Sequence, residues 1–283
     1  MKILVTGSGG QLGSEIKSLS EELTKLTFDF TDFPETDITN RDQINELFEA
    51  GQYDYCINCA AYTAVDKAEE DRDVADSINV LGSENLARAC NAWRTTLFHI
   101  STDFVFDGTS SKPLAETEPT HPVNYYGTSK LKGEQAVADH LKQYFIFRTS
   151  LLYSTFGNNF VKTMLRLSQS KDQLGIIADQ IGSPTYARDL ARVILKIIDS
   201  QSTAYGLYHY SNEGVASWYD FTCAIFEYRN IQTKVNPIPT TNYPTPAARP
   251  HYSVMDKAKF RDTFGIEISH WRDSLKQCLK AMG

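Results

Sequence analysis

Short hydrophobic runs alternate along this chain with segments in which apolar residues recur every three or four positions. The runs have the length and continuity of strands covered on both faces, and they are Lys2–Thr6, Leu26–Thr31, Tyr55–Cys59, Leu97–Thr102 and Tyr144–Arg148. The segments between them have helical spacing: one begins near Gln11, and others cover 37–48 and 79–90. In the 37–48 segment, DITNRDQINELF, Thr39 or Asn40 can cap the helix.

This order of elements predicts the fold class. Strands that alternate with helices imply a parallel sheet, because parallel neighbours need a crossover connection. We therefore predict an α/β fold, a Rossmann-type doubly wound parallel sheet with a smaller C-terminal lobe that binds the substrate. We place the first domain at 1–150 and the lobe mainly at 151–283, since prolines and aromatics become frequent after Arg148. The amphipathic helix around 186–199 is expected to return to the sheet.

The composition limits what the chain binds. It has 283 residues, of which 41% are apolar, and a formal net charge of −7. Contacts along a nucleic acid need clustered Lys and Arg, so no nucleic-acid partner is expected. No run of about 18 apolar residues is present, and the N-terminus MKILVTG lacks the long apolar stretch of a signal peptide. We expect no membrane segment and a cytoplasmic location.

A glycine-rich turn directly follows the first predicted strand. In TGSGGQLG, Gly7, Gly10 and Gly13 stand at three-residue intervals. Glycine permits a tight turn, lets the backbone approach a pyrophosphate and lets the following helix pack closely, while the helix N-terminus offers free N–H groups to phosphate. The spacing resembles that of the extended short-chain dehydrogenase/reductase superfamily, so NADH or NADPH is the expected cofactor.

An acidic residue about 20 positions after the glycine turn should bind the adenosine ribose. Asp32, at the end of the second predicted strand, has this spacing, whereas its rival Asp29 lies inside the apolar run. No arginine stands beside Asp32 to receive a 2′-phosphate, which favours NADH over NADPH.

Two further pairs of residues are expected near the cofactor. Within the superfamily an Asp followed by a hydrophobic residue contacts the adenine, and the resemblance gives this role to Asp37 and Ile38. Ala60 and Ala61, which follow the third predicted strand, are small enough to let a cofactor pass close to the backbone.

The segment NYYGTSK contains the candidate catalytic pair. Reduction of a ketone leaves negative charge on its oxygen, which needs a proton donor. Tyrosine, with a pKa of about 10, can serve if a nearby ammonium favours its charged form. At about 100° per helical residue, Tyr126 and Lys130 differ by about 40° and share a face, whereas Tyr125 and Lys130 differ by about 140°. This geometry selects Tyr126.

A third catalytic group is expected at the end of the fourth predicted strand. The strand ends in Ser101 and Thr102, and strand carboxyl ends in such sheets face the ligand crevice. The Thr102 hydroxyl can donate to the same substrate oxygen as Tyr126. We therefore predict Thr102, Tyr126 and Lys130 as the catalytic residues.

Taken together, the motifs resemble the dTDP-4-dehydrorhamnose reductase family. The blocks appear in that family's order over nearly the whole chain, and they are TGSGGQLG, DITN, NCAAYTAVDKAE, STDFVFDG, NYYGTSK, FRTSLLY, NNFVKTMLRL, DQIGSPT and YPTPAARP. The resemblance implies that NADPH or NADH reduces the 4-keto group of dTDP-4-dehydro-β-L-rhamnose to give dTDP-L-rhamnose.

The resemblance also implies roles for single residues. Tyr126 would donate the proton, Lys130 would hold the nicotinamide ribose and lower the tyrosine pKa, and Thr102 with Asp103 would bind the sugar. Arg249 is a candidate for the substrate diphosphate, because a planar guanidinium suits phosphate. The residues implied to line the cofactor are Gly10, Gln11, Leu12, Asp37, Ile38, Ala61, Tyr62 and Thr63.

Two positions depart from the family pattern. The family often has tryptophan near the sugar after RTS, where this chain has Leu151. Some members form dimers through Mg²⁺ held by acidic side chains, but Arg188 stands near where an acid would accompany Glu15. No metal is therefore expected, and none is needed for hydride transfer. The sequence carries no signal of oligomeric state and is compatible with a homodimer.

Two alternative functions share these motifs. One is another nucleotide-sugar enzyme; Phe104 after Asp103 speaks against a dehydratase, which has a glutamate there, whereas an epimerase keeps the tyrosine and lysine. The other is a non-catalytic subunit that resembles the regulatory subunit of methionine adenosyltransferase. The presence of Thr102, Tyr126 and Lys130 favours an enzyme over a regulator.

Overall fold

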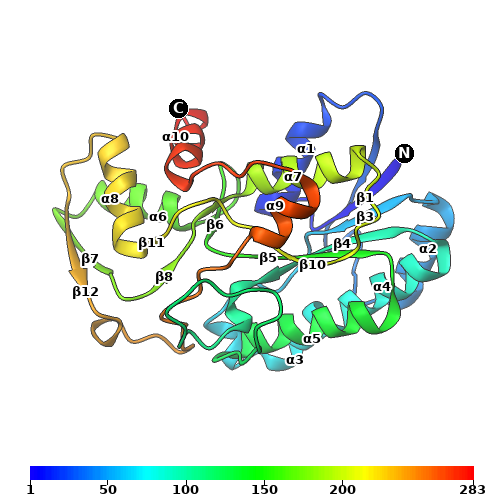
Figure 1. The fold of residues 1–283 in the computed structure, drawn as a ribbon, viewed down its shortest axis with the longest axis horizontal. Helices are drawn as coiled ribbons and strands as arrows, with labels where there is room; N and C mark the ends of the chain where they lie inside the picture. The colour runs from blue at the N-terminus through cyan, green and yellow to red at the C-terminus, as the bar shows by residue number, and fades with distance from the viewer.

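The centre of the molecule is a six-stranded sheet in which all neighbouring strands are parallel, in the order β10–β5–β4–β3–β1–β2 (Figure 1). The computed structural model describes all 283 residues. The strands are β1 (Lys2–Thr6), β2 (Thr27–Phe30), β3 (Tyr55–Asn58), β4 (Thr96–Thr102), β5 (Tyr144–Thr149) and β10 (Gly206–His209). The predicted α/β class is confirmed, and β1 to β5 nearly coincide with their predicted bounds.

Helices cover both faces of this sheet. One face carries α1 (Gln11–Ser20), α7 (Ala187–Asp199) and α9 (Ala258–Phe264); the other carries α2 (Arg41–Gly51), α4 (Gly82–Trp93) and α5 (Tyr125–His140). Ile3 and Val5 belong to the first core and Leu4 to the second. Successive strand residues thus enter opposite cores, which explains the continuous apolar runs.

The helix predicted at 79–90 begins differently from the expectation. Short helical segments at Lys67–Glu69 (η1) and Arg72–Asp76 (α3) precede a π-helical turn at Ser77–Leu81 (η2), and α4 starts only at Gly82. Within the π turn, the Asn79 side chain accepts a hydrogen bond from Tyr62 N (2.9 Å) and donates to Ser129 Oγ (2.9 Å). Such turns are frequent at functional sites, and this one ties the segment after β3 to α5.

The remaining elements form a smaller lobe that follows the end of β5. Its helices are α6 (Phe160–Ser168), α8 (Trp218–Tyr228) and α10 (Trp271–Ala281). Its strand pairs are β6 (Leu152–Tyr153) with β9 (Thr185–Tyr186), β7 (Gln173–Ile177) with β12 (Lys234–Ile238), and β8 (Ile181–Gly182) with β11 (Ala216–Ser217). The lobe has a core of its own, built around residues such as Tyr153, Phe221 and Leu275.

The C-terminal half contributes more to the sheet than the sequence suggests. Helix α7 packs against α1, and β10 and α9, which were expected in the lobe, lie at the β5 edge of the sheet. Because β5 leads directly into β6, the carboxyl ends of the strands face the lobe. Residues at the strand ends therefore lie next to the lobe, at the place where doubly wound sheets bind ligands.

Candidate active site

The glycine turn between β1 and α1 is built so that a side chain would not fit. Gly7 has φ +64°, and a Cβ there would lie 2.4 Å from Ala60 N. A Cβ on Gly13 would lie 2.5 Å from Gly7 O. Helix α1 begins at Gln11, and its N-cap is Gly10. Because glycine has no side chain, the first N–H groups of the helix have no side-chain partner. These free donors suit a pyrophosphate.

A cavity of about 540 Å³ lies beside this turn and is lined by half of the predicted cofactor residues. Its lining includes Gly7, Gly10, Asp32, Asp37, Ile38, Ala60 and Ala61. Asp32 accepts hydrogen bonds from Gly9 N and Phe33 N, both at 2.8 Å, so its carboxylate lies at the glycine turn. Asp29 instead pairs with Lys2 and Tyr53 at 2.9 Å each. The structure thus places Asp32, and not Asp29, at the cavity.

The other predicted cofactor residues lie near this cavity but do not line it. Leu12 is buried, and the Tyr62 hydroxyl donates to Asp71 at 2.9 Å while Thr63 is exposed. Gln11 Oε1 is buried and has no hydrogen-bond partner, so it is free for a ligand at the start of α1. The narrow turn, the open helix end and this unpartnered oxygen fit a dinucleotide.

Helix α5 presents the predicted catalytic pair beside the end of β4. Asn124 caps the helix, its Oδ1 accepting from Gly127 N at 2.7 Å. A Cβ on Gly127 would lie 2.2 Å from Phe104 O, so glycine lets the start of α5 pack against η3 (Asp103–Val105), just after Thr102. Tyr126 therefore lies against Phe104, with 6.0 Å between the ring centroids, in an edge-on arrangement.

The two neighbouring tyrosines have different surroundings. Tyr125 donates to Asp76 at 2.9 Å, and the guanidinium of Arg72 lies 4.8 Å from its ring centroid. Tyr126 faces Thr102 and Asp103, which both influence the pKa of its phenol. The structure therefore gives the two tyrosines different partners, and Tyr126 is the one that lies beside Thr102.

The proton affinities at this site are set mainly by burial. Burial raises the pKa of Tyr126 to about 12; the hydrogen-bonding Thr102 side chain lowers it and the Asp103 charge raises it. Burial lowers the pKa of Lys130 to about 8, against the charge of Glu134, which raises it. A lowered tyrosine pKa was expected, and in this structure the loss of water around the phenol outweighs the effects of its neighbours.

The predicted sugar-binding residues meet on the lobe side of Thr102. Asp103, Leu151 and Arg249 line one narrow cavity of about 20 Å³, together with Ser253 and Trp218. Asp103 is buried and accepts a hydrogen bond from Ser253. Burial raises its pKa to about 7, against the lowering effect of its hydrogen bonds to Ser253 and Thr102.

Trp218 is a residue of this cavity that the sequence analysis missed. It is the first residue of α8, which Ser217 and Asp220 begin with a reciprocal capping box. Its Nε1 donates to Gln180 Oε1 at 3.2 Å, and it lines the same cavity as Leu151. The capping pattern in SWYD could have located the helix start, although not its neighbours. An aromatic side chain thus reaches this cavity from another element of the lobe.

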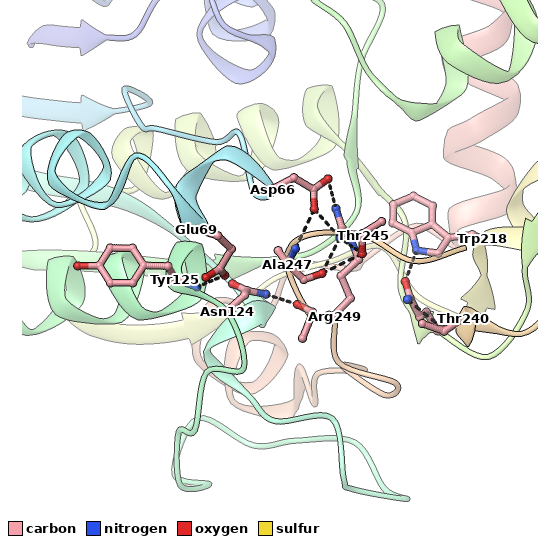
Figure 2. Close-up of polar contacts among 11 residues, drawn as sticks. Asp66, Glu69, Asn124, Tyr125, Trp218, Thr240, Thr245, Ala247 and Arg249 are labelled. Carbon is pink, nitrogen blue, oxygen red and sulfur yellow. Dashed lines mark hydrogen bonds and ion pairs between the residues drawn. The ribbon is translucent and has the colours of Figure 1, made fainter. Parts of the chain in front are cut away.

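Arg249 lies in this cavity but already has partners, as Figure 2 shows. Its Nη1 and Nη2 bond the two carboxylate oxygens of Asp66 at 2.9 and 3.0 Å. Nη1 also donates to Thr245 Oγ1 (2.8 Å) and Ala247 O (2.9 Å). The guanidinium predicted for a diphosphate is therefore engaged by a carboxylate.

Glu15 and Arg188, which were considered in connection with a metal, form an ion pair. Glu15 Oε2 lies 3.1 Å from Arg188 Nη1, and the Ser154 hydroxyl donates to Glu15 Oε1 at 2.6 Å. The carboxylate thus has a protein counter-charge.

No helix of the chain has the length and apolar character to cross a bilayer.

The fold and the site together define a Rossmann-type nucleotide-binding protein with Thr102 at a strand end and with Tyr126 and Lys130 on the neighbouring helix α5, a set of residue types typical of short-chain oxidoreductases. The family model for the RmlD substrate binding domain matches residues 1–283. The chain therefore belongs to this family.

Similar proteins agree along the whole chain. The curated dTDP-4-dehydrorhamnose reductase of Aggregatibacter actinomycetemcomitans is 42% identical, over 97% of this chain and 97% of its own length. A solved structure of a dTDP-4-dehydrorhamnose reductase from Clostridium acetobutylicum is 42% identical, covers 100% of this chain and 99% of its own, and superposes with a TM-score of 0.96. That of Bacillus anthracis, in complex with NADP, is 40% identical, covers 99% of each chain and gives a TM-score of 0.94.

Proposed function

We propose that this chain is an NAD(P)H-dependent reductase that converts the 4-keto group of dTDP-4-dehydro-β-L-rhamnose to the alcohol of dTDP-L-rhamnose. The observation that supports it best is that Tyr126 faces Thr102 and Asp103, of which Asp103 lines the narrow cavity, from the helix that also carries the buried Lys130. The similarity to reductases of this name over the whole chain supports the choice of substrate.

The proposed reaction needs one proton at the ketone oxygen. When bound, the reduced nicotinamide supplies a hydride to the carbonyl carbon, and the electron pair of the C=O bond moves to oxygen. Tyr126, whose raised pKa keeps it protonated at neutral pH, donates its proton to that oxygen. Lys130 and Thr102 stabilise the phenolate that remains, and solvent restores its proton.

Other residues bind and orient the two reactants under this proposal. The backbone at Gly7 and Gly10 holds the pyrophosphate, and Asp32 holds the adenosine ribose. Asp103 and Leu151 lie against the sugar. Lys130 also holds the nicotinamide ribose, a role that the family resemblance implies. Since a nucleotide sugar and a reduced nicotinamide are both cytoplasmic metabolites, we place the reaction in the cytoplasm.

The test is turnover of the proposed substrate. dTDP-4-dehydrorhamnose would be made in situ by the enzymes that precede this step, and oxidation of NADH and of NADPH would be followed by the loss of the absorbance of the reduced nicotinamide. Product analysis should show dTDP-L-rhamnose, whereas an epimerase would give an epimer without net oxidation of cofactor. Absence of turnover from folded protein that binds cofactor would reject the proposal.

A further inference from the structure

Residues 243–253, YPTPAARPHYS, form a strap that joins the lobe to the catalytic side of the crevice (Figure 2). On the lobe side, Ile181 N donates to His251 O (2.8 Å) and Ser253 N donates to Ile181 O (2.9 Å). On the catalytic side, the side chain of Ser253 donates to Asp103. The strap therefore sets where one wall of the sugar cavity lies.

The middle of the strap is fastened by one carboxylate. Asp66 makes the bidentate pair with Arg249 and also accepts from Ala247 N at 3.2 Å. Arg249 Nη1 also donates to Thr245 Oγ1 and Ala247 O, so the strap curves around the guanidinium. Because both Asp66 oxygens are used, replacing this single side chain would release three hydrogen bonds at once.

Asp66 belongs to the segment that carries the predicted cofactor residues. It follows Tyr62 and Thr63 in the segment after β3. A second residue that holds the strap belongs to the start of the catalytic helix α5. Asn124, which caps α5, donates from Nδ2 to Ala248 O at 2.7 Å. The strap thus contacts the cofactor segment, the start of the catalytic helix and the sugar cavity.

We propose that Asp66 and Arg249 act as a clasp that holds the strap in place, so that Arg249 is a positioning residue for the thymidine-diphosphate sugar and not a ligand of its diphosphate. The proposal rests on the proposed reductase function. A guanidinium that is paired with a carboxylate through two parallel bonds offers an anion little uncompensated charge. The Arg249 partnership also lowers the pKa of Asp66, so the pair stays charged at neutral pH.

The two roles of Arg249 predict opposite effects of Asp66→Asn. If Arg249 binds the diphosphate directly, loss of the Asp66 charge frees the guanidinium and strengthens binding. If Asp66 and Arg249 form a clasp, Asp66→Asn loosens the strap and weakens binding, as Arg249→Met does. The double variant should then be no worse than either single one, because both act through one pair.

The experiment measures dTDP affinity by calorimetry and KM for the dTDP-keto sugar in the wild type, both single variants and the double variant. Relative to the wild type, we expect each of the three variants to bind dTDP about tenfold more weakly and to have a KM about tenfold higher. A tenfold change is on the scale of the coupling between charged groups in contact. Glu84→Gln, which removes the carboxylate of the Glu84–Arg88 pair on α4, is the matched control and should behave as the wild type. Stronger dTDP binding by Asp66→Asn, or unchanged binding by Arg249→Met, would overturn the clasp.

Hydrogen exchange of the strap gives a readout that does not depend on turnover. The amide of Ala247 donates to Asp66, so Asp66→Asn should accelerate exchange in residues 245–251 while α5 stays protected. Unchanged exchange would overturn the clasp even if the wild type proved inactive. Absence of wild-type turnover with accelerated exchange in Asp66→Asn would instead count against the proposed reaction alone.

Discussion

Replacing Tyr126 by phenylalanine removes one oxygen from the site and keeps the ring that packs edge-on against Phe104. If Tyr126 is the proton donor, the loss should cost the contribution of a general acid, about 100- to 10,000-fold in kcat, or about 3–5 kcal/mol in the barrier. Cofactor binding should persist, because Tyr126 does not line the cavity that contains the glycine turn and Asp32. The assay is steady-state oxidation of NADH with the dTDP-keto sugar, together with cofactor affinity from nicotinamide fluorescence.

Tyr125→Phe is the matched control for this change. It removes a hydroxyl whose partner is Asp76 of α3, at 2.9 Å. A hydrogen bond of this kind contributes about 1 kcal/mol to stability, so the melting temperature should fall by a few degrees while kcat stays within about twofold. Full activity in Tyr126→Phe, or loss of activity in Tyr125→Phe with intact folding, would refute the assignment.

Three further changes test other parts of the site. Gly7→Ala should abolish cofactor binding and lower stability, because its Cβ would clash with Ala60 N at 2.4 Å; unchanged cofactor affinity would contradict the role of the turn. The cavity beside Asp32 is lined by acidic residues and no Lys, Arg or His, so kcat/KM should favour NADH over NADPH, and Asp32→Ser should shrink that ratio; a wild-type preference for NADPH would count against this explanation. Burial raises the pKa of Asp103 in the folded protein to about 7, whereas an ordinary Asp has a pKa of about 4. The folded state therefore binds this proton more tightly than the unfolded state does, and the resulting stabilisation is lost as the pH rises from about 4 through 7. Asp103→Asn should remove this pH dependence of the melting temperature, and an unaltered dependence would assign it to other groups.

The features that could be predicted from the sequence are those with a local signal. The strands β1 to β5 are continuous apolar runs, and the preference for Tyr126 over Tyr125 follows from helix periodicity alone. The cap at Asn124 is equally local, because Asn is a preferred N-cap residue and this one directly precedes the first helical residue.

The features that could not be predicted depend on residues far apart in the chain. Asp66 and Arg249 are separated by 183 positions, and nothing near either residue indicates the other. The sequence therefore suggests that Arg249 is a free cation for phosphate, and only the fold shows that it is paired with the Asp66 carboxylate. The pKa of Tyr126 was misjudged for a related reason: a neighbouring lysine can be read from helical spacing, whereas the extent of burial cannot.

A buried carboxylate one turn beyond Lys130 connects the catalytic groups to the sheet. Glu134 accepts hydrogen bonds from Arg148 Nε (2.9 Å) and Nη2 (2.7 Å), and Ser101, the residue before Thr102, also donates to it. The same side chain therefore fixes α5 against β4 and β5 and places a negative charge near the Lys130 ammonium.

A buried histidine, His99, also lies near Lys130. It stays neutral, because burial and the lysine charge hold the pKa of His99 well below its ordinary value.

These two effects of Glu134 can be separated by experiment. Lys130 is charged below its pKa of about 8 and loses this charge as the pH rises, so kcat/KM should fall on the alkaline side from about pH 8. Glu134→Gln should move this fall to lower pH, and it should also destabilise the fold by about 3–5 kcal/mol because it leaves the buried Arg148 without a counter-charge. The double variant Glu134→Leu/Arg148→Met removes both charges and should recover most of the stability. If Glu134 acts on Lys130, the double variant will still lose activity at a lower pH than the wild type; if it recovers the wild-type pH profile together with the stability, Glu134 serves only to hold the helix.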